Sequence, residues 1–403
     1  GTFDCRSCSS CNQNSWGYTI QSHQGNGEEP ELYFFNGEVI GVQGAFSTSA
    51  GYSEIRDGSF TTVACVQHST GNSAFYALYI AGESGEVESN IYGGTFTSAT
   101  RVAALIGNTN DGGLKKNAIA HFYGGTFIGG GNQTAVKVDY SIGGLEITGG
   151  TYSSDVTAYV PAGNSVTSDG SGNFVVELDT KTAVVEIDGA GYTSMQAAVD
   201  AIAASHSKTS TITVQKDIPD AEGVSVPSGL KLTVDFAGYI YTLSGPGAGS
   251  TNTETNGFQL LKDSEIVFKN GTIKIAENAN NIKRMIQSYA DVTLENMRFE
   301  AENQVGGEDY ALSFNHGNVV FKGDTSVITS SSDTIAFDVC FWTPYYPDGV
   351  SVTFADDYTG TVNGKILYDS TDEEKAELVI GGNGSFGSIE TSSSSTEQPN
   401  IKI

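Results

Sequence analysis

The stretch Ser89-Asn90-Ile91-Tyr92-Gly93-Gly94-Thr95-Phe96 decides the fold, because it joins a short alternating strand to a glycine corner and a second strand. The same template returns with its aromatic residue at Phe60, Phe127 and Tyr152, at intervals of 36, 31 and 25 residues. Motifs that recur at such intervals are typical of solenoids, in which each copy forms one coil stacked on the next. We expect the differences in interval to lie in loops.

Each copy of the template reads as strand, corner, strand. In the strands before the corners, such as 120–123 and 145–148, alternate side chains point to one face. The glycine pair supplies backbone angles that a side chain would penalise, and the following threonine and aromatic residue return to the interior. Stacked copies therefore bury a continuous apolar column, and Phe96 and Phe127 should be buried in register.

The second half of the chain repeats this logic with different residues. The stretch 265–273 aligns with 291–299, and 318–324 is a third copy. Asn270 and Asn296 fall at the corner, where a left-handed backbone conformation is needed that asparagine tolerates better than most residues. We interpret both as turn-formers rather than catalytic residues.

One amphipathic helix is predicted at 193–204, where Met195, Ala198, Val199 and Ile202 have helical spacing after a Thr/Ser cap. A helix at this place would cover the open end of the first coil of the second half, where apolar core and unpaired strand edges are exposed.

Together these patterns predict three segments: a cysteine-containing N-terminal segment at 1–30, a glycine-rich solenoid segment at 31–180, and a second parallel β-helix segment at 181–403.

Composition agrees with an all-β chain. The 403 residues include 50 glycines and only 8 prolines, together with 19 tyrosines and 20 phenylalanines, which suits many short strands separated by tight turns.

The chain is strongly acidic: its 47 acidic and 20 basic residues give a net charge of −27. Such a surface repels phosphate backbones and anionic lipids, so we expect no nucleic-acid partner. The chain has no run of 18 apolar residues and no signal-peptide pattern, so we expect no membrane insertion.

Three of the five cysteines form the run C-x-x-C-x-x-C at Cys5, Cys8 and Cys11. A four-coordinate metal site would need a fourth ligand, for which His23 is the nearest candidate. The alternatives are a local disulfide or inert thiols near a frayed terminus. Cys65 and Cys340 lie in apolar runs and are interpreted as small core residues.

A resemblance follows from the run IDGAGYTSMQAAV at 187–199 with the strands at 212–215 and 232–236. These residues resemble the opening of right-handed parallel β-helix proteins of the pectin-lyase-like superfamily. The GGTF units and the connector at 151–163 are similar to repetitive secreted surface proteins of gut bacteria. The resemblance implies a right-handed parallel β-helix. It implies no single activity, since that superfamily includes pectate lyases, polygalacturonases, phage tailspikes and adhesins.

Catalytic patterns of that superfamily do not carry over to this chain. Lyase members pair calcium-binding aspartates with a basic residue, and hydrolase members carry clustered aspartates and a Gly-His-Gly turn. Asn315-His316-Gly317-Asn318 comes nearest to that turn, but it aligns with corner residues of the neighbouring repeats. Carboxylates for acid–base cleavage could come from Asp333, Asp338, Asp356 and Asp357. No catalytic residue is assigned.

The loop at 341–349 is the most distinctive candidate for binding, because its two prolines exclude regular strand pairing. Aromatic rings can stack on sugars, and carboxylates can accept hydrogen bonds from hydroxyl groups. The predicted ligand-binding residues are Trp342, Tyr345, Tyr346, Asp338 and Asp348. The alternative is that these rings fold back over the coil as a packing cluster.

The leading hypothesis is a non-catalytic bacterial protein, secreted or on the cell surface, that binds glycan or acts as an adhesin. A polysaccharide lyase or glycoside hydrolase is the alternative from a different class. An architectural stalk or tailspike-like protein is the third possibility. No cofactor is predicted, although calcium could bridge carboxylates to an acidic polysaccharide.

Overall fold

The computed structural model describes the chain except for residues 6–17, 24–27, 43, 64–75, 84, 108–116, 140–143, 252, 304–309, 342–344 and 396–397. Strands dominate the regular structure of the described residues, with α1 (Met195–Ala204) as their α-helix, so the expected all-β class is confirmed. They divide into an N-terminal unit, residues 1–183 with 188–191, and a C-terminal unit, residues 184–187 with 192–403.

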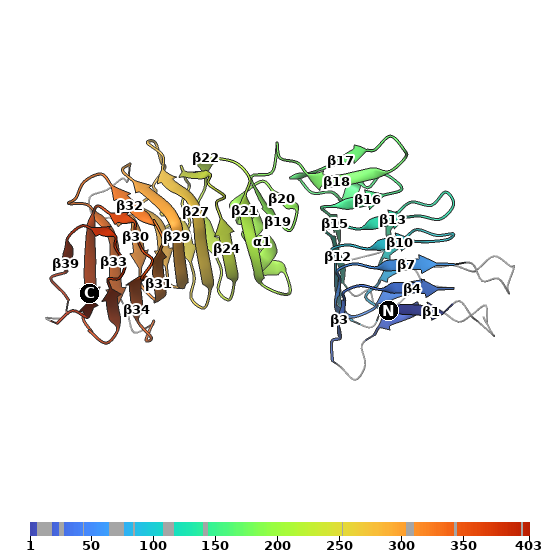
Figure 1. Cartoon of the computed structure of the whole chain (residues 1–403), viewed down its shortest axis with the longest axis horizontal. Helices are drawn as coiled ribbons and strands as arrows, with labels where there is room; N and C mark the ends of the chain where they lie inside the picture. Colours follow the sequence, from blue (N-terminus) through green and yellow to red (C-terminus); the bar gives the residue numbers. More distant parts are fainter. Residues whose placement is uncertain are drawn as a thin grey trace. The chain divides into compact units, whose positions relative to one another are not determined.

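The N-terminal unit contains three sheets, in which each strand up to β16 pairs with strands three positions earlier or later in the chain, and β18 and β17 extend the first sheet beyond β16. Strands of the first sheet lie side by side in Figure 1. In pairing order this sheet contains β1 (Thr2–Cys5), β4 (Glu38–Gly41), β7 (Ser59–Thr62), β10 (Thr95–Thr97), β13 (Thr126–Ile128), β16 (Gly150–Tyr152), β18 (Phe174–Leu178) and β17 (Asn164–Ser168). The second sheet contains β14 (Val136–Val138), β11 (Ala104–Ile106), β8 (Leu78–Ile80), β5 (Gly44–Thr48) and β2 (Tyr18–Ser22). The third contains β15 (Leu145–Ile147), β12 (Ala118–Phe122), β9 (Val87–Ile91), β6 (Gly51–Ile55) and β3 (Glu31–Phe34).

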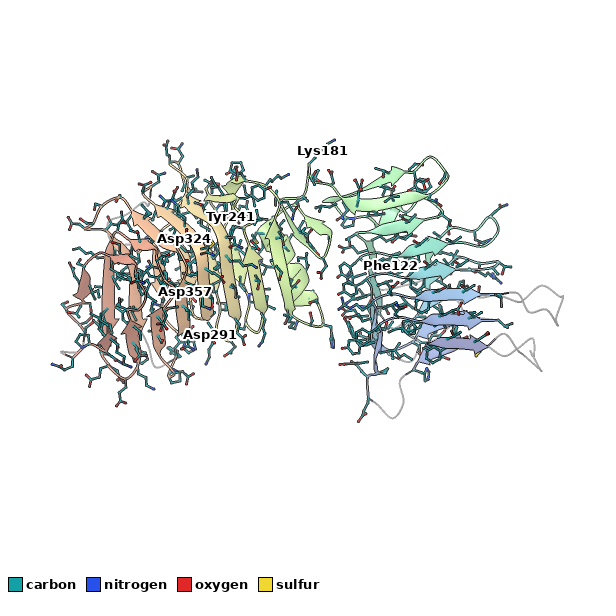
Figure 2. All side chains as sticks on the ribbon, in the orientation of Figure 1. Phe122, Lys181, Tyr241, Asp291, Asp324 and Asp357 are labelled. Carbon is teal, nitrogen blue, oxygen red and sulfur yellow. The ribbon has the colours of Figure 1, made fainter. Side chains whose placement is uncertain are left out.

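Register in the first sheet follows the sequence template. Phe60 pairs with Phe96, Phe96 with Phe127, and Phe127 with Tyr152, all between parallel strands. All four rings are fully buried. Phe122 of β12, labelled in Figure 2, is also buried and stacks on Phe127 with ring centroids 4.6 Å apart. The prediction that the aromatic residues of the template are buried in register is confirmed.

The corner before each of these aromatic residues depends on glycine. Gly125 has φ +103°, and a Cβ at this position would lie 3.1 Å from the carbonyl oxygen of Gly94. Gly125→Val is therefore expected to lower the free energy of unfolding by roughly 1–3 kcal/mol, through backbone strain and crowding. Denaturant unfolding measures the change. Gly144→Val is the matched control, because Gly144 has open space around its Cα; equal midpoints for the two variants would contradict the strain argument.

Two further sheets make up the C-terminal unit, apart from Ala190 and Gly191 of β20, which belong to the N-terminal unit. The larger one contains β20 (Ala190–Tyr192), β19 (Val185–Ile187), β21 (Thr209–Val214), β24 (Lys231–Asp235), β27 (Glu265–Ile275), β29 (Asp291–Ala301), β31 (Gly317–Lys322), β34 (Val350–Phe354), β37 (Ala376–Val379) and β40 (Ile401–Lys402), with β22 (Ile218–Ala221), β25 (Ile240–Leu243), β32 (Ser326–Thr329), β35 (Thr361–Val362) and β38 (Ser385–Phe386) beside this path. The smaller one contains β23 (Val224–Val226), β26 (Asn256–Leu260), β28 (Arg284–Ser288), β30 (Leu312–Phe314), β33 (Ile335–Phe341), β36 (Lys365–Ser370) and β39 (Ile389–Thr391).

The repeats predicted in the second half of the chain pair with one another in the predicted alignment. Strands β27 and β29 are parallel, with Glu265 opposite Asp291 and Ile273 opposite Phe299, and β31 continues the same register against β29. At the corners, Asn270 has φ +59° and Asn296 has φ +51°. Their interpretation as left-handed turn-formers is confirmed.

The predicted helix is also present as α1 (Met195–Ala204), and Ser194 caps it by accepting a hydrogen bond from the N–H of Ala197. Its buried residues are Met195, Ala198, Val199 and Ile202, the four expected from the spacing, and they join the core of the C-terminal unit. Pairing is parallel along most of both units. Antiparallel pairs join β16 with β18, β17 with β18, and β19 with β21, near the junction of the two units in the sequence, and an isolated antiparallel bridge joins Ala248 and Asn256.

Candidate functional site

The loop between β33 and β34 begins after Phe341 and returns to the sheet at Val350. The predicted ligand Trp342 lies outside the described residues, as do 343 and 344. At the far end of the loop, the N–H of Gly349 donates to the carbonyl of Tyr346 at 3.2 Å, and Gly349 has φ +85°. This turn orients Tyr345, Tyr346 and Asp348.

The two tyrosines of the loop lie in different environments. Tyr345 is 83% exposed, the highest value for an aromatic residue among the described part of the chain. Tyr346 is half-buried and stacks on Tyr289, with ring centroids 4.8 Å apart, and it also contacts the His316 ring at 5.2 Å. The packing alternative therefore describes Tyr346, whereas Tyr345 remains on the surface.

Asp338 lies beneath the surface rather than at the rim of the loop. Its side chain is on β33, is only 3% exposed, and accepts the N–H of Phe314 at 3.0 Å. Burial raises the pKa of this carboxyl to about 7, and the hydrogen bonds from Ser313 and the Phe314 N–H oppose that rise. The expectation that Asp338 accepts sugar hydroxyls assumed an exposed group, because sequence alone did not show which loops cover β33. Asp348, which is exposed, retains that proposed role.

Asp348 lines a polar hollow of about 400 Å³, which we call the loop pocket. Its other charged or polar side chains are Asp291, His316, Asn318, Ser351, Glu374, Lys375, Glu377 and Asn400. Figure 2 labels Asp291 at the start of β29. The pocket therefore brings together residues from the corners before β29 and β31, from the loop, and from the segment around β37.

Some side chains of the loop pocket are already engaged in hydrogen bonds or an ion pair with other residues. Asp291 accepts the backbone N–H of Asn318 at 2.7 Å and its side-chain amide at 3.1 Å, and Glu377 forms an ion pair with Lys402. His316 is 8% exposed, and its Nδ1 has no hydrogen-bond partner among the described residues. The lining is polar and predominantly acidic, which suits a ligand rich in hydroxyl groups and disfavours an anionic one.

A second group of polar side chains surrounds Asp338 on the smaller sheet of the C-terminal unit. The guanidinium of Arg284 lies over the ring of Tyr310 at 5.5 Å. Asp369, on the neighbouring strand β36, accepts hydrogen bonds from Ser392 and Ser394 and lies 3.8 Å from the Sγ of Cys340. Burial raises the pKa of Tyr310; Asp338 and Asp369 raise it further and Arg284 lowers it, so the charges in this group influence one another.

Other carboxylates considered from the sequence do not share this environment, since Asp333, Asp356 and Asp357 are exposed. Sequence reasoning placed His316 at a corner, and it does lie between β30 and β31, but its contact with Tyr346 was missed. Tyr289 was missed as well, although it also follows a strand of the same sheet. The signal that could have found both residues is their shared position just after aligned strands.

The cysteine run is described only at Cys5, an exposed thiol in β1; Cys8, Cys11 and Cys65 lie outside the described residues. Cys340 is 7% exposed, as expected of a core residue, and burial raises the pKa of its thiol. Within the described ranges, no group of three His, Cys, Asp or Glu side chains could hold a metal ion. Calcium binding therefore stays a prediction without an assigned site.

Comparisons with known proteins give no relative for this chain. No protein-family model matches it, and neither a curated protein nor a solved structure is significantly similar. In the described part of the chain, no helix combines the length and apolarity needed to cross a bilayer.

Proposed function

We propose that both units are right-handed parallel β-helices of the pectin-lyase-like kind. Parallel pairing between strands three apart in the N-terminal unit supports this proposal, as do the aligned registers of β27, β29 and β31. Buried rings that repeat from strand to strand are the expected core of stacked coils.

The function that we propose is non-catalytic glycan binding by a secreted or cell-surface bacterial protein. The observation that carries it is the loop pocket, a polar hollow lined by Asp348, which follows the exposed Tyr345 by three residues in the same loop. Sugars present hydroxyl groups to carboxylates and amides, and their C–H faces pack on aromatic rings. The −27 net charge favours neutral over anionic glycans.

Tyr345→Ala combined with Asp348→Asn is expected to weaken glycan binding at the loop pocket at least tenfold without changing the melting temperature. Both residues are exposed, so their replacement removes little packing. Affinity electrophoresis against a panel of neutral polysaccharides measures binding, and a thermal scan measures folding. Tyr239→Ala is the control, since Tyr239 is an exposed aromatic residue just before β25 and not in the loop at 341–349.

Unchanged retention of the double variant would contradict binding at the loop pocket. Tyr346→Ala adds a separate check. Because Tyr346 stacks on Tyr289, its loss is expected to lower the melting temperature as well as the retention.

Polysaccharide cleavage is the second candidate function, favoured by the group around Asp338. A buried carboxyl with a pKa of about 7 can serve as a general acid, and the neighbouring strand supplies Asp369 as a carboxylate. A reducing-end release assay on the same polysaccharides tests it. Product that disappears in both Asp338→Asn and Asp369→Asn would favour the enzyme over the binding protein.

A further inference from the structure

The N-terminal unit carries a second cluster of aromatic and charged side chains, on the outer side of its third sheet. Alternation along β6 separates two faces: Ile55 belongs to the apolar core, whereas Tyr52 and Glu54 lie on the opposite face, at 7% and 8% exposure, and lead to the exposed Arg56. We call the outer surface the Tyr–Glu face and define it by Tyr33, Tyr52, Glu54, Arg56, Asn90 and Tyr92.

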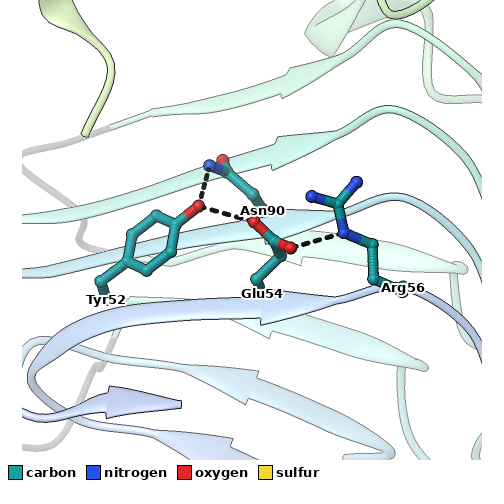
Figure 3. A network of polar contacts seen from close by, with 4 residues as sticks. All are labelled: Tyr52, Glu54, Arg56 and Asn90. Atoms are coloured by element: carbon teal, nitrogen blue, oxygen red, sulfur yellow. Dashed lines mark hydrogen bonds and ion pairs between the residues drawn. The ribbon is translucent and has the colours of Figure 1, made fainter. Parts of the chain in front are cut away.

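The centre of the Tyr–Glu face is a connected set of hydrogen bonds, drawn in Figure 3. The hydroxyl of Tyr52 donates to one carboxylate oxygen of Glu54 at 3.0 Å, and the Nε of Arg56 donates to the other. The side-chain amide of Asn90, opposite Glu54 on β9, donates to the Tyr52 hydroxyl at 3.1 Å. The carboxylate is thus held in one orientation before any ligand arrives, which lowers the cost of binding.

One acceptor in this set has no donor. Asn90 is only 6% exposed, and its Oδ1 has no hydrogen-bond partner among the described residues. A buried acceptor in that state is costly, because it has lost its water without gaining a protein donor. A ligand hydroxyl would satisfy it after a rotation of the Asn90 amide toward the surface, because the oxygen itself has almost no exposed area.

Two flat rings border the set on the side of β3, the last strand of the third sheet. Tyr33 is 47% exposed, is held by a hydrogen bond to Glu31, and packs against Tyr52 with ring centroids 5.8 Å apart. Phe35, two residues further along, is 70% exposed. Exposed rings of this kind mark interaction sites, and their faces suit the C–H faces of sugars.

Charge decides which sugars the face can accept. Glu54 already engages Arg56, whose guanidinium also covers one side of the Tyr92 ring at 3.9 Å, and the register adds Glu31 and Glu88 on either side of Tyr52. An anionic chain would meet this acidic surface, on which the Arg56 guanidinium is already paired with Glu54. We infer that the Tyr–Glu face is a second binding site, for a neutral polysaccharide whose rings stack on Tyr33 and Phe35 and whose hydroxyls reach Asn90 and Glu54.

This inference is independent of the loop pocket and is tested in the full chain by separating the two sites. In gels that contain a soluble β-glucan, a mannan or a galactan, the Tyr345→Ala, Asp348→Asn variant should remain retarded by at least one of the three. Adding Tyr33→Ala and Phe35→Ala should reduce the remaining affinity at least tenfold, and polygalacturonate should retard none of the proteins. Both added positions are exposed, so the melting temperature should stay constant.

Each outcome separates the two sites. Unchanged retention after the Tyr33 and Phe35 substitutions, or stronger retention by polygalacturonate, overturns the Tyr–Glu face. Retention lost already in the loop-pocket variant supports the loop pocket and overturns the Tyr–Glu face. Retention that depends only on Tyr33 and Phe35 supports the Tyr–Glu face and overturns the loop pocket, and no retention of the wild type overturns both.

Discussion

Phe127→Ala is expected to lower the free energy of unfolding by about 3–5 kcal/mol, because it removes a large buried ring and leaves a cavity. The Phe127 ring is fully buried and stacks on Phe96 at 4.7 Å and on Tyr152 at 5.1 Å, while Phe122 packs on it from the third sheet. Phe127 therefore packs against the neighbouring repeats as well as filling the interior of its own repeat. Chemical denaturation followed by circular dichroism measures the loss.

Ile128→Ala is the matched control for that experiment, since Ile128 is the next residue in β13 and is 40% exposed. We expect a change within about 0.5 kcal/mol for this surface position. If Phe127→Ala unfolds at the same denaturant concentration as the control, the ring is not in the interior and the register of the repeats is wrong.

Asp338 is expected to make stability depend on pH between about 4 and 7. Burial raises its pKa in the folded protein to about 7 from the ordinary value of 3.8. In that window the folded protein keeps a proton that the unfolded chain releases, so the stabilisation present below pH 4 is lost as pH rises toward 7. The loss amounts to about 4 kcal/mol at most, from roughly 1.4 kcal/mol per pH unit.

Asp338→Asn should remove this part of the pH dependence, because the amide stays neutral and its oxygen can still accept the Phe314 N–H. The measurement is the free energy of unfolding of both proteins at several pH values from 4 to 8. The free energy of unfolding of the variant, relative to that of the wild type, should increase with pH and level off above pH 7. Asp333→Asn, at an exposed position, is the control; a wild-type curve parallel to that of Asp338→Asn would refute the buried acid.

The strands and corners could be predicted because their determinants are local. Alternation fixes which side chains of a strand share a face, so one aligned template was enough to place Phe96 opposite Phe127. The left-handed corners at Asn270 and Asn296 and the cap at Ser194 likewise depend on a few neighbouring residues.

The candidate sites could be predicted only in part, because they depend on which outward-facing residues other segments cover. The loop was found from its prolines and aromatic residues, but its sequence did not distinguish exposed Tyr345 from Tyr346, which packs on a residue 57 positions earlier. The Tyr–Glu face escaped notice for a related reason. Glu54 and Asn90 are 36 residues apart, and only the pairing of β6 with β9 brings them side by side.

By itself, the sequence determined the all-β class, the registers of its repeats and the capped helix at 195–204, since backbone preference and side-chain alternation act over a few residues. The tertiary structure alone decided that Asp338 is buried with a raised pKa, that His316 meets Tyr346, and that Asn90 is left with an unused acceptor. Burial and hydrogen bonding at an outer face depend on the neighbouring coil and the loops above it, and those contacts exist only once distant segments are stacked.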